Sequence, residues 1–338
     1  MKRVLSRPWL PATLLAAGLS LLTAIGMKAD EGRLVVYCGR GEELIRPLIE
    51  RFEQETGIDV SIRYAGTAEL AATLLEEGAH SPADVFFAQD AGALGALHRH
   101  GALAPLPTDL IERVPPRFRS PDGTWVGVSG RARVLVYNPQ RITEAELPAT
   151  LDALTGPAWK GRIGWAPENA SFQSFVTALR IQRGDAAALA WLKGIQANEP
   201  HPYAKNSAIV AAVAAGEIDA GLVNHYYLYG ARRTNPNINA RNHYFPEPGA
   251  GSLVNVAGVG LLKTSRRTAE AERFIHYLLD HRAQTYFAHE TAEYPLIADV
   301  SLPPDLKPLD TIATPDLDLN QLEDLEGTLS LIRQAGIF

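Results

Sequence analysis

Two adjacent tyrosines, Tyr226 and Tyr227, are the residues whose types and spacing most directly suggest chemistry. They follow an apolar run at 218–223 that is predicted to be a strand of an α/β sheet, and such sheets bind ligands beyond the carboxyl ends of their strands. In the first turn of a helix, neighbouring side chains diverge by only about 100°, so both phenols can reach one point. A trivalent cation can displace the protons of two phenols whose ordinary pKa is about 10. The pair therefore indicates either a site for a hard cation or ordinary packing of two rings, and these residues alone leave both open.

Cationic and polar residues at other predicted strand and helix ends are candidates for holding an anion. Arg40 follows the first predicted strand, and Arg131 and Arg133 share one face of a long strand because they are two residues apart. Asn169 and Ser171 precede a predicted helix, whose free N–H groups can bind an anion. The alternative for these two residues is that they only cap that helix.

Sequence signatures of catalysis do not occur in the chain. It contains no Gly-x-Ser-x-Gly elbow, no phosphate-loop lysine motif and no His-Glu-x-x-His. The segment 39–44 has the start of a dinucleotide-binding loop, but Leu44 stands where a small residue is needed, and Glu42 and Glu43 would face a pyrophosphate. We therefore predict a binding protein and not an enzyme.

The elements that must position these residues alternate between strands and helices. This rhythm predicts parallel sheets covered by helices. The predicted strands are 34–38, 60–64, 84–88, 125–137, 162–166, 218–223 and 254–262. The predicted helices are 42–56, 68–77, 91–100, 171–182, 186–196, 206–215, 269–279, 282–288 and 319–334.

Two α/β units with a cleft and a hinge account for this order of elements. Strands near 130–136 and 253–258 are expected to cross between the units. We predict that 30–132 plus 257–307 form the first lobe and that 133–256 plus 308–338 form the second.

Composition and charge narrow the class of protein. The 338 residues are 46% hydrophobic and 21% charged, as in ordinary globular proteins, and a single cysteine excludes an internal disulfide. The formal charge is −6 with no basic run, so we expect no nucleic-acid partner, since phosphate contacts need clustered cations.

The N-terminus has the order of a secretory signal. A positive head is followed by the apolar run 9–25 and by small residues, which predicts a signal peptide over 1–29 that is cut after Ala29. The cut would remove four basic residues and no acid, leaving a charge of −10. The alternative is a membrane anchor, but the run is short and contains Pro11 and Gly18. The mature chain is therefore expected outside the cytoplasm without stable membrane insertion.

Taken together, these features resemble the periplasmic ferric-ion-binding proteins, which supply iron to ABC importers. The resemblance extends over the whole mature chain, and its most specific parts are Ser-Pro-Ala-Asp-Val and the Tyr-Tyr context. The segments that carry it are 36–40, 76–78, 81–86, 129–133, 159–164, 203–206, 216–219, 224–227 and 293–296. The resemblance implies the type II periplasmic binding protein fold, with two lobes, a ligand cleft between them and hinge strands.

The resemblance also implies that Tyr226 and Tyr227 bind Fe(III). Other members complete the metal shell with a histidine, a glutamate or a third tyrosine, at positions that are Gly41, Gln89 and Asn169 here. An exogenous anion, carbonate or citrate, is therefore expected to complete it. The positions that would hold this anion by resemblance are Arg40, Arg131, Asn169 and Ser171. Glu42, Asp90 and Tyr229 are alternative replacement ligands.

The function implied is that of a monomeric periplasmic receptor that captures ferric iron and passes it to an ABC importer permease. The alternative is the same fold binding a small organic or phosphorylated anion without iron, with the arginines as the main contacts.

Overall fold

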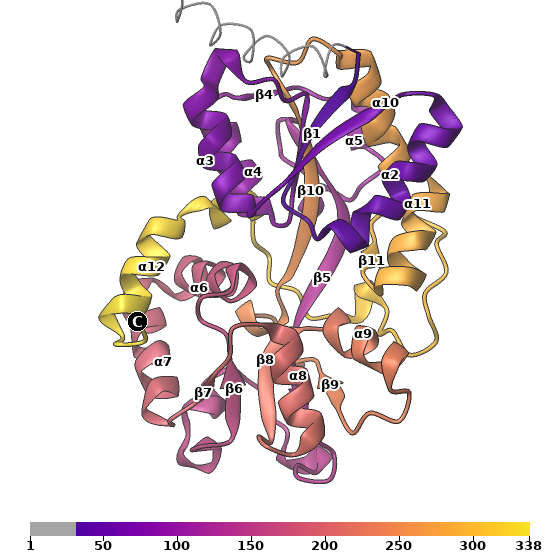
Figure 1. Cartoon of the computed structure of the whole chain (residues 1–338). Coiled ribbons are helices and arrows are strands. Elements are labelled where there is room, and N and C mark those ends of the chain that lie inside the picture. Colours follow the sequence, from indigo (N-terminus) through magenta and orange to yellow (C-terminus); the bar gives the residue numbers. More distant parts are fainter. Residues whose placement is uncertain (1–31) are drawn as a thin grey trace, which may run out of the picture.

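The computed structural model describes residues 32–338 and shows two α/β lobes, one above the other, connected by long strands (Figure 1). The predicted signal peptide lies outside these residues. The two-lobe α/β architecture predicted from the sequence is confirmed, whereas the residue boundaries of the lobes stay a prediction. Within 32–338, no helix is both long enough and apolar enough to cross a membrane.

The first lobe is built on a sheet with the strand order β2-β1-β3-β10-β5. β1 pairs in parallel with β2 and β3, whereas β10 runs antiparallel to β3 and β5. The strands are β1 (Leu34–Cys38), β2 (Val60–Tyr64), β3 (Val85–Ala88), β5 (Trp125–Tyr137) and β10 (Val254–Leu262), with β4 (Leu103–Ala104) and β11 (Tyr294–Pro295) at their sides.

Helices cover this sheet with apolar faces of the expected period. The long helix that follows β1 buries Ile45, Leu48, Ile49 and Phe52, and it ends at Gly57, whose φ of 70° favours glycine. The helices of this lobe are α2 (Glu42–Thr56), α3 (Thr67–Glu77), α4 (Ala91–Arg99), α5 (Thr108–Ile111), α10 (Thr268–Leu278) and α11 (His281–Tyr286). The last of these was predicted to continue to 288, but the chain passes into a π-helical turn, η7 (Phe287–Thr291).

The second lobe contains the far half of β5 together with four shorter strands. β8 and β9 run antiparallel to β5, and β6 runs parallel to β7 and β8. The strands are β6 (Ile163–Trp165), β7 (His201–Pro202), β8 (Ala220–Asn224) and β9 (Arg241–His243). The helices are α6 (Ala170–Arg183), α7 (Asp185–Ala197), α8 (Asn206–Ala215) and α9 (Tyr226–Thr234).

β5 passes from one sheet to the other between two adjacent residues. Ala132 pairs with Val254 of β10, and Arg133 pairs with Asn224 of β8. The Arg133 N–H also donates to the carbonyl of Leu253, just before β10 begins. The arginines of β5 are therefore placed where the two lobes meet.

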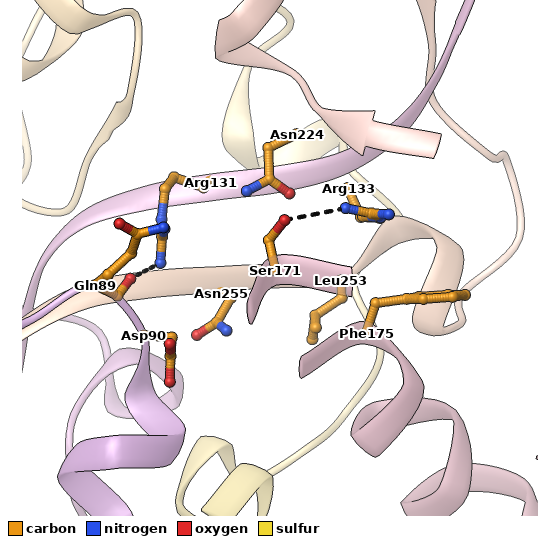
Figure 2. Close-up of a pocket in the computed structure, with 9 residues that line it drawn as sticks. All are labelled: Gln89, Asp90, Arg131, Arg133, Ser171, Phe175, Asn224, Leu253 and Asn255. Carbon is orange, nitrogen blue, oxygen red and sulfur yellow. Dashed lines mark hydrogen bonds between the residues drawn. The ribbon is translucent and has the colours of Figure 1, made fainter. Parts of the chain in front are cut away.

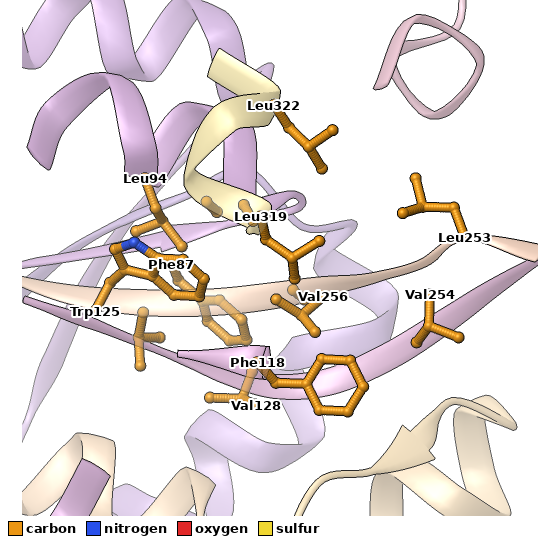
Figure 3. Close-up of a cluster of buried hydrophobic side chains, with 14 of the residues drawn as sticks. Phe87, Leu94, Phe118, Trp125, Val128, Leu253, Val254, Val256, Leu319 and Leu322 are labelled. Atoms are coloured by element: carbon orange, nitrogen blue, oxygen red, sulfur yellow. The ribbon is translucent and has the colours of Figure 1, made fainter. Parts of the chain in front are cut away.

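The C-terminal segment differs from the prediction of one helix over 319–334. A 3-10 helix, η9 (Leu319–Glu323), is followed by α12 (Leu325–Gln334), because the Asp324 side chain accepts a hydrogen bond from Gly327 N–H and caps a new helix. Leu319 and Leu322 join the core of the first lobe near Leu94 of α4 (Figure 3), whereas α12 lies beside α6 and α7 of the second lobe (Figure 1). The prediction of a continuous helix was wrong because the two halves pack on different lobes.

Candidate functional site

The two tyrosines occupy the first turn of a helix at the end of a strand. β8 ends at Asn224, His225 follows, and α9 begins with Tyr226 and Tyr227. Their rings stack with centroids 4.3 Å apart and planes inclined by 27°. Both residues are partly exposed, and Tyr227 also packs against the apolar cluster of the second lobe.

The phenol of Tyr226 lies among charged groups. Burial raises the pKa of Tyr226 well above its ordinary value, the neighbouring Tyr227 adds to the increase, and Arg131 and Arg40 oppose it. The free phenol is therefore neutral near pH 7, and a metal ion must displace its proton to bind there.

Arg40 reaches this region through a buried ion pair that sequence reasoning missed. Its Nη2 donates to Glu293 at 2.6 Å, and neither side chain is exposed. Glu293 also accepts a hydrogen bond from Ser129 Oγ–H at 2.8 Å. Burial alone would lower the pKa of Arg40 and raise the pKa of Glu293. The opposite charge of the partner outweighs burial in both cases, so the pKa of Arg40 is raised and that of Glu293 is lowered. Both side chains therefore stay ionised. Glu293 belongs to one of the segments that carry the resemblance, yet no local pattern links it to a partner 253 residues away.

Removing the Glu293 carboxylate is expected to destabilise the protein strongly, because it leaves the Arg40 charge buried and unpaired. We expect Glu293→Ala to lower the free energy of unfolding by about 3–5 kcal/mol in denaturant titrations of the metal-free protein. Glu290→Ala is the matched control, since Glu290 pairs with Arg233 on the surface and such pairs contribute about 0–1 kcal/mol. Equal losses in the two variants would contradict the prediction.

Arg131 and Arg133 line a pocket between the lobes (Figure 2). Arg131 donates to the backbone carbonyl of Gln89, and Arg133 donates to Ser171 Oγ at 3.4 Å and to the Leu222 carbonyl at 3.1 Å. Burial lowers the pKa of Arg133 to about 9, and only the phenol of Tyr227 acts in the opposite direction. The other lining residues are Asp90, Phe175, Asn224, Leu253 and Asn255.

The pocket is small, and donors around it lack partners. Its volume is about 10 Å³, close to the space of one water molecule. Among residues 32–338, no hydrogen bond is made by the buried Nε groups of Arg131 and Arg133, nor by Nε and Nη1 of Arg40. These donors suit an anion, because buried N–H groups are normally hydrogen-bonded.

Asn169 is the N-cap of α6, and Ser171 lies in the first turn of this helix. Asn169 Oδ1 accepts from the Ser171 N–H at 3.0 Å and from its hydroxyl at 2.6 Å. Asn206 Nδ2 donates to Asn169 Oδ1 and to Ser171 Oγ. Ser171 lines the pocket, whereas Asn169 has the N-cap role and does not line it.

The alternative metal ligands lie in three different environments. Glu42 forms an exposed ion pair with Arg46, and the Tyr229 hydroxyl donates to the Asp305 carbonyl. Asp90 lines the pocket and caps α4; burial raises its pKa, and Arg131 opposes this. No three His, Cys, Asp or Glu side chains gather as a metal site within 32–338. The assignment of Tyr226 and Tyr227 as metal ligands stays a prediction.

His225 is a second residue that sequence reasoning did not single out. It is fully buried between Asn224 and the tyrosines, and its ring stacks on Tyr294 with centroids 4.6 Å apart. Burial lowers its pKa to about 4, and hydrogen bonds to Ala292 and Ala132 act in the opposite direction. The imidazole is neutral at physiological pH. The feature of the sequence that could have drawn attention to His225 was its position directly before the two tyrosines.

Two lobes joined by crossing strands, with a polar pocket between them, define a solute-binding protein. The family model of bacterial extracellular solute-binding proteins matches residues 80–319, and the chain belongs to this family. The type II periplasmic binding protein fold is confirmed by solved structures of similar chains.

The relatives include proteins that bind ferric iron. The chain is 34% identical over 333 residues to the Fe(3+)-binding periplasmic protein of Serratia marcescens, covering 97% of each chain. It is similar to iron-bound HitA from Pseudomonas aeruginosa, with a TM-score of 0.85 and 35% identity over 90% of this chain and 99% of that one. For Trichodesmium FutA in complex with iron and citrate, the TM-score is 0.80 and the identity is 30%, covering 91% and 100%. The resemblance noted in the sequence is confirmed.

Proposed function

We propose that this protein captures ferric iron outside the cytoplasm, with a synergistic anion or as a chelate, and delivers it to an ABC importer. The observation that carries the proposal is the stacked pair Tyr226 and Tyr227 at the start of α9, beside buried arginines. Two phenolates suit a hard trivalent ion, and relatives named for binding ferric iron match nearly the whole chain.

An anion completes the metal shell in this proposal. Gly41 offers no side chain, Gln89 offers a neutral amide, and Asn169 is engaged in capping α6. The two phenolates leave most positions of a six-coordinate ion free, and carbonate or citrate would fill them. Arg40 and Arg131 bring the unpartnered donors that would bind this anion, and Ser171 lines the same pocket as Arg131.

Opening and closing of the lobes would control access to the site. The pocket between the lobes is small, about 10 Å³, and separation of the lobes would make room for the anion and the metal. Docking on the permease would reopen the lobes and release iron. We propose a periplasmic monomer with a cleaved signal peptide, which binds and releases its ligand without turnover.

Metal analysis and a visible spectrum of the purified protein test this function. We expect one iron per chain and a tyrosinate-to-iron charge-transfer band that strengthens when carbonate or citrate is added. A colourless protein that retains no iron with either anion would refute the proposal.

A second candidate function is binding of an organic or phosphorylated anion without iron. The guanidinium groups of Arg131 and Arg133 favour it, because both arginines are buried and line the pocket. Calorimetry with citrate and with a sugar phosphate, in the presence of a metal chelator, tests it. Heat of binding under these conditions would support this candidate, and its absence would exclude it for the anions used.

A further inference from the structure

We infer that His225 is a positioning residue, which fixes Tyr226 and Tyr227 relative to the arginines of β5 and to the Arg40–Glu293 pair. The inference rests on the proposed function, since it concerns how the same site is held. It is carried by the contacts of one fully buried imidazole with two other segments of the chain.

The first contact joins the tyrosine helix to β5. The backbone N–H of Ala132 donates to His225 Nδ1 at 3.1 Å, and the backbone N–H of His225 donates to the Ala132 carbonyl at 2.9 Å. Ala132 stands between Arg131 and Arg133, where β5 changes sheets. The imidazole thus extends the pairing of β8 with β5 by one residue, up to the start of α9.

The second contact joins the same ring to the turn that carries Glu293. Because Nδ1 accepts a hydrogen bond, Nε2 carries the proton, and it donates to the Ala292 carbonyl at 2.7 Å. Ala292 has a φ of 55°, a left-handed conformation that is unfavourable for a residue with a side chain. The bond therefore braces a strained turn directly before Glu293, which in turn holds Arg40.

The ring has contacts on its face as well. It stacks on Tyr294, whose strand β11 pairs with β5. The backbone carbonyl of His225 is held as well, because it accepts a hydrogen bond from Asn242 Nδ2 at 2.9 Å. One side chain therefore links the phenols, the strand of the two arginines and the Glu293 turn. Residues that hold metal ligands in position without binding the metal themselves typically change the metal affinity 10–100-fold when they are substituted.

Variants of His225 separate the two hydrogen bonds. His225→Phe keeps a ring and removes both, His225→Asn places an acceptor near Ala132 N–H, and His225→Gln places a donor near the Ala292 carbonyl. We expect His225→Phe to weaken iron binding about 10–100-fold and to shift the charge-transfer maximum, with Asn and Gln in between. The readouts are iron affinity by chelator competition at fixed anion concentration, the visible spectrum, and thermal unfolding of the metal-free protein.

His243→Phe is the matched control. His243 is a partly buried histidine of the same lobe, whose Nε2 lies 2.8 Å from the Pro148 carbonyl and whose ring packs edge-to-face on Phe245. We expect this variant to lower the unfolding temperature without changing the band or the affinity. A purely structural role of His225 would give the same result at both positions.

The outcomes distinguish this inference from the proposed function. A wild-type protein without iron and without the band refutes the proposed function. A wild-type band together with unchanged affinity and spectrum in folded His225→Phe overturns only the inference. If the Phe variant does not fold, the Asn and Gln variants decide by the same criteria, and failure of all three to fold also overturns it, because the role would then be in folding.

Discussion

Replacing both Tyr226 and Tyr227 with phenylalanine is expected to abolish the charge-transfer band and tight iron binding. Phenylalanine keeps the ring stacking but removes both phenol oxygens, which are the proposed metal ligands. Each single variant is expected to lose at least about 100-fold in affinity, because loss of a direct ligand exceeds the usual effect of an outer partner. Chelator competition and the visible spectrum of each variant measure the change.

Tyr229→Phe is the matched control for the tyrosine variants. Tyr229 lies one turn further along α9, and its hydroxyl donates to the Asp305 carbonyl. Its replacement is expected to cost about 0.5–1.5 kcal/mol of stability and to leave the band intact. Retained colour in the double variant, or loss of colour in Tyr229→Phe, would overturn the assignment of the ligands.

Iron affinity is expected to fall steeply as the pH falls. Burial raises the pKa of Tyr226, so the free phenol keeps its proton at neutral pH and the metal must displace it. Each displaced proton makes the apparent affinity tenfold lower per unit decrease in pH, so two phenols give about 100-fold per unit. The sign follows because acid favours the protonated, metal-free site. Chelator competition between pH 6 and 8 at saturating anion, corrected for the pH dependence of the chelator and the anion, gives the slope.

Single tyrosine variants provide the internal comparison for this slope. Tyr226→Phe is expected to displace about one proton fewer on binding iron, so its iron affinity should change about tenfold per pH unit. An equal slope in the wild type and in Tyr226→Phe would show that this phenol does not lose its proton on binding.

The secondary structure could be predicted well where local patterns determine it. The apolar period of 42–56 and the glycine after it suffice for α2, because burial of one face and a left-handed C-cap are local properties. The same reasoning was wrong for 319–334, which is amphipathic throughout but is interrupted at Asp324. An apolar period shows that one face of a segment is buried. It does not show that the two halves of the segment are buried against different lobes.

The candidate site was predictable in part for the same reason. Tyr226 and Tyr227 follow a strand directly, so their place in the first turn of a helix could be expected from neighbours in the chain. Arg40 was visible as a cation after the first strand, but its partner Glu293 was not, since only folding brings together residues so far apart. His225 was overlooked because a single histidine has no ligand spacing.

The amino-acid sequence by itself determined the order of strands and helices, the adjacent phenols at a strand end and the resemblance to ferric-ion-binding proteins. Hydrophobic period, capping residues and adjacency act over a few residues, so they can be read along the chain. Only the tertiary structure decided that β5 changes sheets at Arg133, that Glu293 neutralises Arg40, and that His225 links both to the tyrosine helix. These contacts form between segments that are distant in the sequence. Their energies depend on burial and on geometry, and both exist only after the two lobes have packed together.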